Sequence, residues 1–384
     1  MFSPKFLSPH TEKFTQCVDT PERVNFLVNN CGVRGARRID VLGRGGFGIV
    51  LKATYRGKRV AVKVVHLRHE HCRVSLNNEG HILGWKHPNI IRIFKIVSDT
   101  NHGLVIMERI PGDNLQSILN TLNLGIRHAL EILSQVASGL NYCHFRGVIH
   151  GDIKPQNILI TLSHEKEGYL AKLCDFGSSS IGNENPSDCR GTIRYMAPEA
   201  LRKAPLTPKA DIFSFGVTMW QIENHKVPYE EIYGNDIIIY RVVREGLRPD
   251  TCQEIDSPKI PKILLDGDSL EIRSFRSQRS ISPREIKSET TVNINAGNSA
   301  ERGSRKPSRS LNALLKEARI ENHEEITEMR KKIHWKNIFK PSKWPKNENY
   351  CNLFQSCWQE DPNLRPGASQ ILNQLHKIIK NIQN

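Results

Sequence analysis

The chain has 384 residues, 38% of them hydrophobic and 25% charged, and its 55 basic and 40 acidic residues give a formal charge of +15. The length allows one large two-lobed domain with tails or two ordinary domains, and the composition is typical of a soluble globular protein with some disordered sequence. The sequence shows no zinc finger, RNA-recognition motif or basic helix interleaved with aromatic residues. We therefore expect a basic solvated surface rather than nucleic-acid binding.

The cysteine pattern indicates a protein of the reducing cytosol or nucleus, and in the absence of targeting signals we expect a cytoplasmic location. The nine cysteines are odd in number and form no CxxC pair, which argues against a disulfide framework or a zinc site and for a reducing compartment. No apolar run approaches the roughly 18 residues that a membrane span needs. Residues 1–14 include Pro4, His10 and Glu12 where a signal peptide would need an apolar core. We therefore expect no membrane segment, and we expect a monomer.

The N-terminal part of the chain predicts a small antiparallel sheet. Residues 1–36 are polar and weakly patterned, which indicates a mostly disordered extension. Residues 37–110 predict a lobe with five strands and one helix, the helix at 74–86 where His87-Pro88-Asn89 breaks it. The five strands are predicted at 39–42, 49–55, 59–65, 90–97 and 103–108.

The rest of the chain predicts a helical lobe with a long interruption. Residues 111–250 have helical spacing at 127–145, 210–224 and 235–245, and residues 346–384 supply the final helices. The order of a β-rich lobe, a hinge and an α-rich lobe gives an α+β fold.

Residues 251–345 form a basic, mostly disordered insert that is nearly free of large aromatic residues until Trp335. Its stretch 311–333 has an amphipathic pattern, which fits either a marginal helix in a solvent loop or a helix that docks a partner. Ser257-Pro258 and Ser282-Pro283 are possible phosphorylation sites.

A glycine motif opens the first lobe. Gly43, Gly45 and Gly48 form GxGxxG, and glycines let the backbone approach phosphate oxygens without a Cβ clash. Dinucleotide-binding folds carry the same motif before a helix. Here a strand pattern follows, which favours a glycine-rich hairpin.

A lysine ends the next apolar strand. Lys63 closes Val60-Ala61-Val62-Lys63, and a buried cation there needs an anionic partner. Glu79, on the predicted helix, could supply it, and the pair would hold the α- and β-phosphates of a nucleotide.

The segment His150-Gly151-Asp152-Ile153-Lys154-Pro155-Gln156-Asn157 carries the strongest chemical signal. Asp152 would orient a substrate hydroxyl and accept its proton, and Lys154 would neutralise the γ-phosphate. Asn157 and Asp175, the latter in Asp175-Phe176-Gly177, offer oxygen atoms suited to Mg²⁺.

With Ala197-Pro198-Glu199 downstream, these motifs resemble the ordered signature set of eukaryotic protein kinases over residues 37–250 and 350–380. The resemblance implies a two-lobed kinase fold, ATP and Mg²⁺ as cofactors, and a protein substrate. It also implies architectural roles for Asp211 and for an ion pair between Glu199 and Arg365. The residues that it assigns to the adenine pocket are Val50, Ala61 and Leu159 around the ring, Met107 as gatekeeper, and the backbone of Glu108 and Ile110.

Two features narrow the resemblance. Lys154 and Thr192 match Ser/Thr kinases rather than tyrosine kinases. Several stretches resemble the Mos family closely, at 52–57, 206–215, 219–221, 246–249 and 357–358. That family implies phosphorylation of a MAP kinase kinase in maturing germ cells. Raf-like or mixed-lineage kinases, and a catalytically weak kinase-fold scaffold, remain alternatives.

Two departures from the kinase pattern bear on regulation and reactivity. Gly151 replaces the Arg that in many kinases clamps a phosphorylated activation loop, and Asp188 lies where the phosphorylated residue often is. The hypothesis is a kinase that is active without activation-loop phosphorylation. Cys174, just before Asp175, is either a small buried hydrophobic residue or a thiol open to electrophiles in the ATP site.

Overall fold

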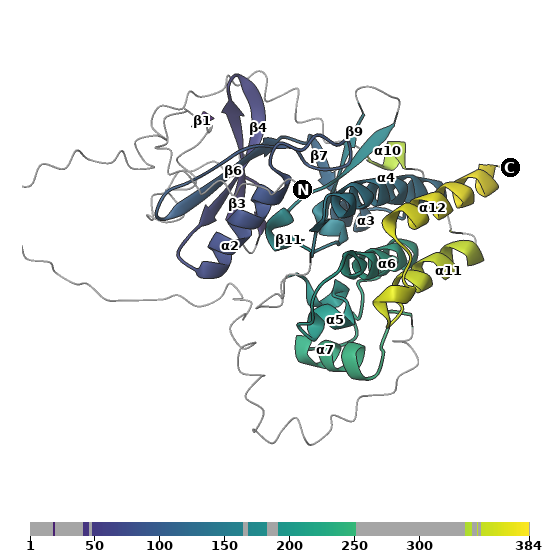
Figure 1. The fold of residues 1–384 in the computed structure, drawn as a ribbon. Helices are drawn as coiled ribbons and strands as arrows, with labels where there is room; N and C mark the ends of the chain where they lie inside the picture. The colour runs from purple at the N-terminus through teal and green to yellow at the C-terminus, as the bar shows by residue number, and fades with distance from the viewer. Residues whose placement is uncertain are drawn as a thin grey trace, which may run out of the picture. The chain divides into compact units, whose positions relative to one another are not determined.

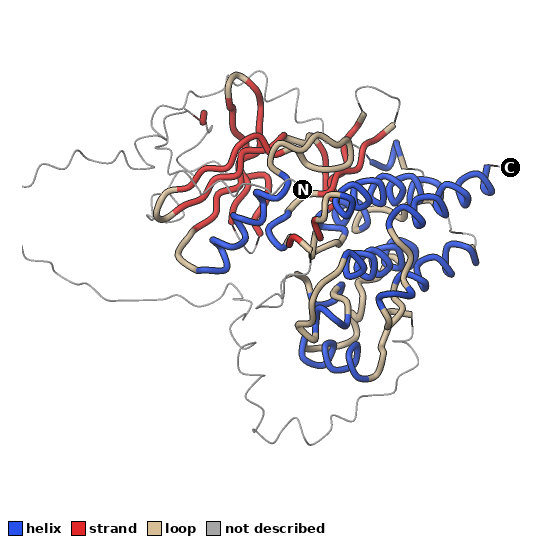
Figure 2. The backbone as a smooth tube through the Cα atoms, viewed as in Figure 1, coloured by secondary structure: helices blue, strands red, loops and turns tan. Residues whose placement is uncertain are grey.

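The computed structural model describes residues 18–19, 41–45, 48–163, 168–182, 191–250, 335–339, 344 and 347–383. Most of the predicted extension and the 311–333 stretch lie outside these residues, as do Ser187 and Asp188. Figure 2 shows that strands dominate the first part of the described chain and helices the rest.

In the part of the chain that the structure describes, the first lobe is a six-stranded antiparallel sheet with one α-helix, α2 (Glu70–Glu79). Five of its strands confirm the sequence prediction, and the sixth, β1, was not predicted. The strand order is β1-β3-β4-β6-β5, with β2 paired to β3 (Figure 1). The strands are β1 (Val18–Asp19), β2 (Val41–Gly45), β3 (Gly48–Tyr55), β4 (Lys58–His66), β5 (Ile93–Ser98) and β6 (His102–Glu108).

Alternation along β3 and β4 divides the sheet into two faces. Leu51, Ala53, Val60 and Val62 pack together in a small apolar cluster on one face. The intervening residues, which include Lys63, lie on the opposite face. The strand alternation therefore places Lys63 away from the lobe's own apolar cluster.

Helix α2 is shorter than predicted at its C-terminal end. We expected a helix to residue 86, but α2 ends at Glu79 and a 3₁₀ turn follows over Gly80–Ile82. Gly80 and Gly84 both lower helix propensity, and Gly84 has a φ of +78°. The predicted end was wrong because it was based on the spacing of apolar residues and did not take these two glycines into account.

The second lobe is built around α6 (Pro208–Asn224), in which every residue from Ala210 to Ile222 is buried. Helix α12 packs on α4, and α11 packs on α6. The other helices among the described residues are α3 (Leu115–Leu119), α4 (Ile126–Phe145), α5 (Pro198–Leu201), α7 (Asn235–Arg244), α10 (Trp335–Ile338), α11 (Glu348–Cys357) and α12 (Ala368–Gln383).

The second lobe also contains two small β-sheets. One has the order β10-β9-β7, with β7 (Gly112–Asn114), β9 (Ile158–Leu162) and β10 (Tyr169–Leu173). The other pairs β8 (Val148–Ile149) with β11 (Ser180–Ile181).

The core resumes earlier than the sequence predicted. We assigned residues up to 345 to the insert, but Trp335 and Phe339 are buried in the main core cluster. Trp344 donates its indole N–H to the Leu124 carbonyl oxygen at 2.6 Å. We call residues 335–339 and 344 the return segment, because there the chain rejoins the folded core.

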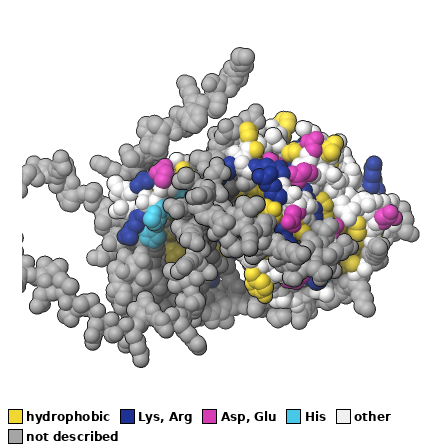
Figure 3. All heavy atoms as spheres, turned by 90° about the horizontal axis from the view of Figure 1, so that it is seen from below, with side chains coloured by type: hydrophobic (Ala, Val, Ile, Leu, Met, Phe, Trp, Pro, Cys, Tyr) yellow, Lys and Arg dark blue, Asp and Glu magenta, His cyan; other side chains and the backbone are white. Residues whose placement is uncertain are grey.

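Among the described residues, no helix has both the length and the hydropathy that crossing a bilayer would require. On the face seen in Figure 3, basic and acidic side chains are interspersed over the described residues.

A buried ion pair joins α5 to the segment before α12. Arg365 Nη1 and Nη2 lie 2.6 and 2.9 Å from the two carboxylate oxygens of Glu199, and the Arg365 side chain is fully buried. This confirms the architectural pair that the resemblance implied. Removing one partner leaves the other charge buried and uncompensated.

We therefore expect Glu199→Gln to lower the free energy of unfolding by about 3 kcal/mol. The matched control is Arg127→Gln, which removes the charge of an exposed side chain paired with Glu131 and should cost about 0.5 kcal/mol. Urea unfolding followed by tryptophan fluorescence measures both. Equal losses for the two variants would contradict the assignment.

Candidate active site

Lys63 is the centre of a three-residue ion cluster. Its ammonium nitrogen lies 2.6 Å from Glu79 Oε1 and 2.7 Å from Asp175 Oδ1. Lys63 comes from β4, Glu79 from the last turn of α2, and Asp175 from the residue after Cys174 beyond β10. The expected Lys63–Glu79 pair is therefore present, and it extends to Asp175.

Burial and charge act in opposite directions in this cluster. Burial alone would lower the pKa of Lys63, but Glu79 and Asp175 together raise it above its ordinary value. Burial raises the pKa of Glu79 despite the attraction of Lys63. Burial would also raise the pKa of Asp175, but Lys63 outweighs it and the pKa is lowered. The Asp175 side chain is the most exposed of the three, at 37%, and stays ionised.

Asp152 lies in a network of four residues. Its Oδ1 accepts a hydrogen bond from the Thr192 backbone N–H at 2.9 Å. Its Oδ2 accepts from Lys154 Nζ at 2.6 Å and from Asn157 Nδ2 at 3.0 Å. Lys154 Nζ also donates to Thr192 Oγ1 at 2.6 Å. The structure thus joins the predicted base and lysine to the residue that matched Ser/Thr kinases.

The loop that carries Asp152 is fixed by a buried carboxylate on α6. Asp211 Oδ2 accepts from the His150 backbone N–H and Oδ1 from the Gly151 backbone N–H, both at 2.8 Å. His144 Nε2 lies 2.9 Å from Asp211 Oδ2. Burial would raise the pKa of Asp211, but His144 and the backbone donors lower it. Asp211 therefore stays ionised and fixes the loop backbone, as the resemblance implied.

Gly151 has a left-handed backbone with φ +78°. A Cβ at this position would lie 2.6 Å from the Ser178 carbonyl oxygen. A side chain here would therefore need both a strained backbone and a displaced Ser178.

Asn157 and Asp175 fit a magnesium site by their chemistry. The Asn157 amide nitrogen donates to the Asp152 carbonyl oxygen and carboxylate, so its amide oxygen is the end that can bind a cation. Asp175 offers its second carboxylate oxygen. The described residues contain no cluster of three His, Cys, Asp or Glu side chains that could hold a metal. Mg²⁺ does not require one, because it binds through one or two protein oxygens plus phosphate and water.

The three glycines of the GxGxxG motif have different structural roles. A Cβ built at Gly48 would lie 1.9 Å from the Val64 carbonyl oxygen, so this glycine permits the close approach of β3 to β4. A Cβ at Gly43 would meet no described atom within 4 Å, so this position is open above the strand. Gly45 pairs with Gly48 in the β2–β3 register, as a hairpin requires.

Four of the predicted adenine-pocket and phosphate residues share one sheet face. In the register of β3, β4 and β6, Val50 pairs with Lys63 and Ala61 pairs with Met107. Cross-strand partners point to the same face, so these side chains lie together. Leu159 is on β9, and it packs against the main core with Met107 and Ile110.

Several contacts around the site were not predicted. Lys172 Nζ lies 2.8 Å from Glu108 Oε1 and links β10 to the end of β6. Asn78 Nδ2 donates to the Gly177 carbonyl oxygen at 2.9 Å, and Ser179 Oγ donates to the Asn78 carbonyl oxygen at 3.1 Å. An asparagine within a helix gave no sequence signal. The lysine of Ala171-Lys172-Leu173, in an apolar strand, gave the same signal as Lys63 and could have been found.

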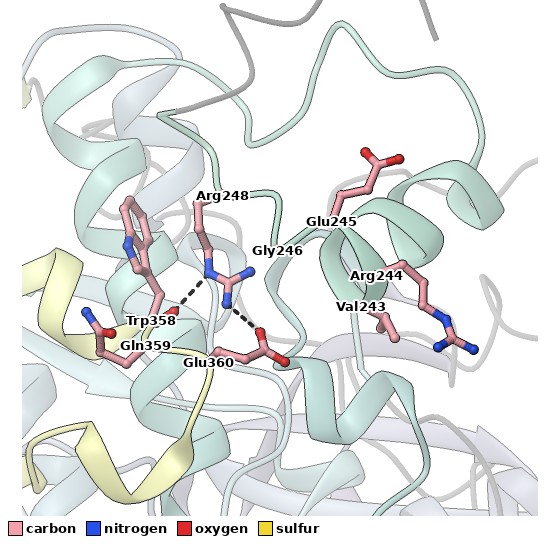
Figure 4. A pocket seen from close by; sticks show the side chains of 8 residues that line it. All are labelled: Val243, Arg244, Glu245, Gly246, Arg248, Trp358, Gln359 and Glu360. Atoms are coloured by element: carbon pink, nitrogen blue, oxygen red, sulfur yellow. Dashed lines mark hydrogen bonds and ion pairs between the residues drawn. The ribbon is translucent and has the colours of Figure 1, made fainter. Parts of the chain in front are cut away.

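A cavity of about 550 Å³ lies between the end of α7 and the turn after α11 (Figure 4). Within it, Arg248 donates to the Trp358 carbonyl oxygen and to Glu360 Oε2. None of the residues that line it is a predicted site residue, so it is separate from the chemistry described above.

Cys174 is a protonated thiol at neutral pH. Burial, followed by the nearby Asp175 and Glu79 carboxylates, raises its pKa. Its Sγ lies 3.4 Å from the Asn157 carbonyl oxygen. Since the thiolate is the reactive form, this environment favours the buried-hydrophobe interpretation.

We expect iodoacetamide at pH 7.5 to alkylate Cys174 at least about tenfold more slowly in the folded protein than in urea. The rate should rise with pH as the thiolate forms. Peptide mass spectrometry measures the rate for this residue alone. Equal rates in folded and unfolded protein would contradict the raised pKa.

Comparisons with known proteins agree with this geometry. The serine/threonine-protein kinase mos of Patiria pectinifera is 34% identical over 228 residues, which cover 54% of this chain and 62% of that protein. The putative mitogen-activated protein kinase kinase kinase 7-like protein of Drosophila melanogaster is 34% identical over 197 residues, which cover 50% of this chain and 49% of that protein. The transforming protein mos of Moloney murine sarcoma virus is 35% identical over 235 residues, with 54% and 60% covered.

The matched region spans between about half and just under two thirds of the length of these relatives. The family model described as the protein kinase domain matches residues 36–376, which include every site residue discussed above. By this match over most of its length, the chain belongs to the protein kinase domain family.

Proposed function

We propose that the protein is a serine/threonine kinase that transfers the γ-phosphoryl group of ATP to a hydroxyl of another protein. The observation that carries the proposal is the network of Asp152, Lys154, Asn157 and Thr192, formed beside the Lys63–Asp175 pair. Pseudokinases typically lack one of these groups, and this chain has them all.

Each group has one task in the proposed reaction. Lys63 holds the α- and β-phosphates, and Glu79 keeps its ammonium in place. Asp152 orients the substrate hydroxyl and accepts its proton, while Lys154 neutralises charge on the γ-phosphate. Asn157 and Asp175 would hold Mg²⁺, which supplies charge neutralisation at the phosphates. In the adenine pocket, the Glu108 and Ile110 backbone would bind the adenine edge between Val50, Ala61 and Leu159.

Thr192 supports the choice of Ser/Thr over Tyr. Its hydroxyl accepts a hydrogen bond from Lys154 and its N–H donates to Asp152, so this residue orients both the proposed base and the lysine at the γ-phosphate. A short acceptor side chain must reach Asp152 directly, and the compact network suits it.

We further propose a place at the top of a MAP kinase cascade, with a MAP kinase kinase as substrate and a Mos-like role in germ-cell maturation. The names of the two kinds of relative, mos and mitogen-activated protein kinase kinase kinase 7, support the cascade level. The germ-cell role rests on the Mos resemblance alone, and a cytoplasmic monomer is part of the same proposal.

Activity is expected to need aspartate at position 152. With ATP, Mg²⁺ and a catalytically inactive MAP kinase kinase, Asp152→Asn should lower phosphoserine formation about 100-fold or more, because an amide cannot accept the hydroxyl proton. The control is Asp361→Asn, which keeps the side-chain oxygen that caps the 3₁₀ helix Pro362–Leu364 and should leave the rate unchanged.

Three outcomes of this assay are informative. If phosphoserine formation is lost in Asp152→Asn but not in the unaltered protein or in Asp361→Asn, the enzyme proposal is supported. If the protein phosphorylates generic proteins but not MAP kinase kinase, the kinase proposal stands and the proposed place in the MAP kinase cascade is contradicted. ATP binding without transfer by the unaltered protein overturns the kinase proposal in favour of a scaffold.

We propose that the kinase needs no activation-loop phosphorylation. Gly151 offers no clamp for a phosphate, and Thr192 is held by ordinary contacts to Asp152 and Lys154. Arg194 Nη1 also donates to the Pro228 carbonyl oxygen at 2.6 Å, which fixes the segment further.

The variant Ser180→Ala with Ser187→Ala should therefore keep full specific activity. Ser179 must be tested separately, because it is fully buried and its hydroxyl lies 2.9 Å from His81 Nδ1. Ser179→Ala should lower activity by loosening α2, whatever the phosphorylation state. A collapse in the Ser180/Ser187 double variant, restored by Glu at either position, would contradict the proposal.

A further inference from the structure

The return segment is hydrogen-bonded to the strand that follows the hinge. Trp335 Nε1 donates to Asp113 Oδ2 at 2.7 Å, although 222 positions separate the two residues. Trp335 is buried, with 6% of its surface exposed. Figure 1 shows α10 beside β9 and α4.

Asp113 is the middle residue of β7, which begins just after the segment 108–110 assigned to the adenine edge. In the register of β7 with β9, Asp113 pairs with Ile160 and Asn114 pairs with Leu159. The Asn114 side chain in turn caps α3 by accepting from the Ser117 N–H. A displacement of Asp113 would therefore act on both the hinge and the adenine-pocket residue Leu159.

The Trp335 ring packs into an aromatic cluster. Its ring stacks on Phe339 with 5.4 Å between centroids and 12° between planes. Phe339 meets the rings of Tyr169 and His128 at 4.9 and 5.2 Å. Tyr169 also donates to Glu131 Oε2 at 2.6 Å. The indole N–H thus projects from an aromatic cluster anchored on α4 and β10.

We propose that Trp335 is a positioning residue for ATP, acting through its hydrogen bond to Asp113. This inference rests on the proposed kinase function. A hydrogen bond to a carboxylate is stronger than one between neutral groups, and the donor is fixed in place. The bond holds β7 against the aromatic cluster, and with it the adenine-binding backbone at 108–110.

The chain supplies a matched control in Trp344. Its indole N–H also donates to an oxygen of the second lobe, the Leu124 carbonyl, at 2.6 Å. Its ring meets Tyr350 with centroids 4.9 Å apart. Leu124 lies before α4 and outside the hinge strand, so loss of this bond removes the same kind of contact without touching β7.

The test compares Trp335→Phe with Trp344→Phe in the full chain. We expect Trp335→Phe to raise the KM for ATP and the Kd for ATP-Mg²⁺ about fivefold with kcat unchanged, which is at the lower end of typical coupling between sites. Trp344→Phe should leave both constants unaltered. The two variants should lose similar thermal stability, since each loses one partly buried hydrogen bond.

Variants of the acceptor separate positioning from folding. Asp113→Asn keeps a side-chain oxygen for the indole N–H and should retain most of the ATP affinity. Asp113→Ala should weaken ATP-Mg²⁺ binding about as much as Trp335→Phe does. The double variant should bind no more weakly than either single variant, because both substitutions remove the same hydrogen bond.

The outcomes distinguish this inference from the kinase proposal. Isothermal titration with ATP-Mg²⁺ needs no transfer reaction, so failure of the unaltered protein to bind ATP overturns the kinase proposal and the inference with it. If the unaltered protein binds ATP and Trp335→Phe binds it equally well, the inference alone is overturned. A loss of affinity that Trp344→Phe shares equally, or that follows thermal stability across all variants, also overturns it.

Discussion

A buried ammonium group at Lys63 is the constraint on which the site depends. It cannot remain charged in the interior without anionic partners, and Glu79 and Asp175, which supply them within the described residues, come from separate parts of the chain. Satisfying Lys63 therefore fixes the end of α2 and the backbone at Asp175 at the same time. The bond from Asn78 to the Gly177 carbonyl oxygen adds a neutral contact across the same boundary. Loss of either carboxylate would leave an unbalanced charge, so the arrangement is held as a unit.

The same principle holds for Asp211 and the loop that carries Asp152. The Asp211 carboxylate is buried on α6, in which every residue from Ala210 to Ile222 is buried, and it accepts hydrogen bonds from two backbone N–H groups of the loop. An ionised carboxylate gains most from charge-assisted hydrogen bonds when water is excluded. The loop conformation that presents Asp152 is thus imposed from the core, and it includes the left-handed turn at Gly151. Asp152 needs only a short side chain, because the backbone that carries it is already in place.

The sequence predicted the parts of this site that follow from charge and periodicity. Lys63 in an apolar strand demanded a carboxylate, and alternation along β4 determined the face on which it lies. Features that depend on tertiary geometry could not be predicted from the sequence. We missed the end of α2, which is set by two glycines, and the hydrogen bond from Asn78 to Gly177, because no sequence pattern relates these two distant residues. The return segment was missed because Trp335 followed a long basic stretch. Averaged over the whole basic stretch, the composition is polar, so the few aromatic residues at its end did not stand out.

The return segment also explains how a long interruption can be accommodated inside a catalytic lobe. The entropy of closing a loop rises only with the logarithm of its length, by about 0.6 kcal/mol for each doubling. For any flexible connection, the cost therefore depends less on the length than on how firmly the chain is fastened at its two ends. At one end, Arg248 is fixed to Trp358 and Glu360, and at the other, Trp335 is fixed to Asp113 and Phe339. Because Trp335 is fastened to Asp113 on β7, close to the segment 108–110, the contact at which the chain rejoins the core is also the one that we propose positions ATP.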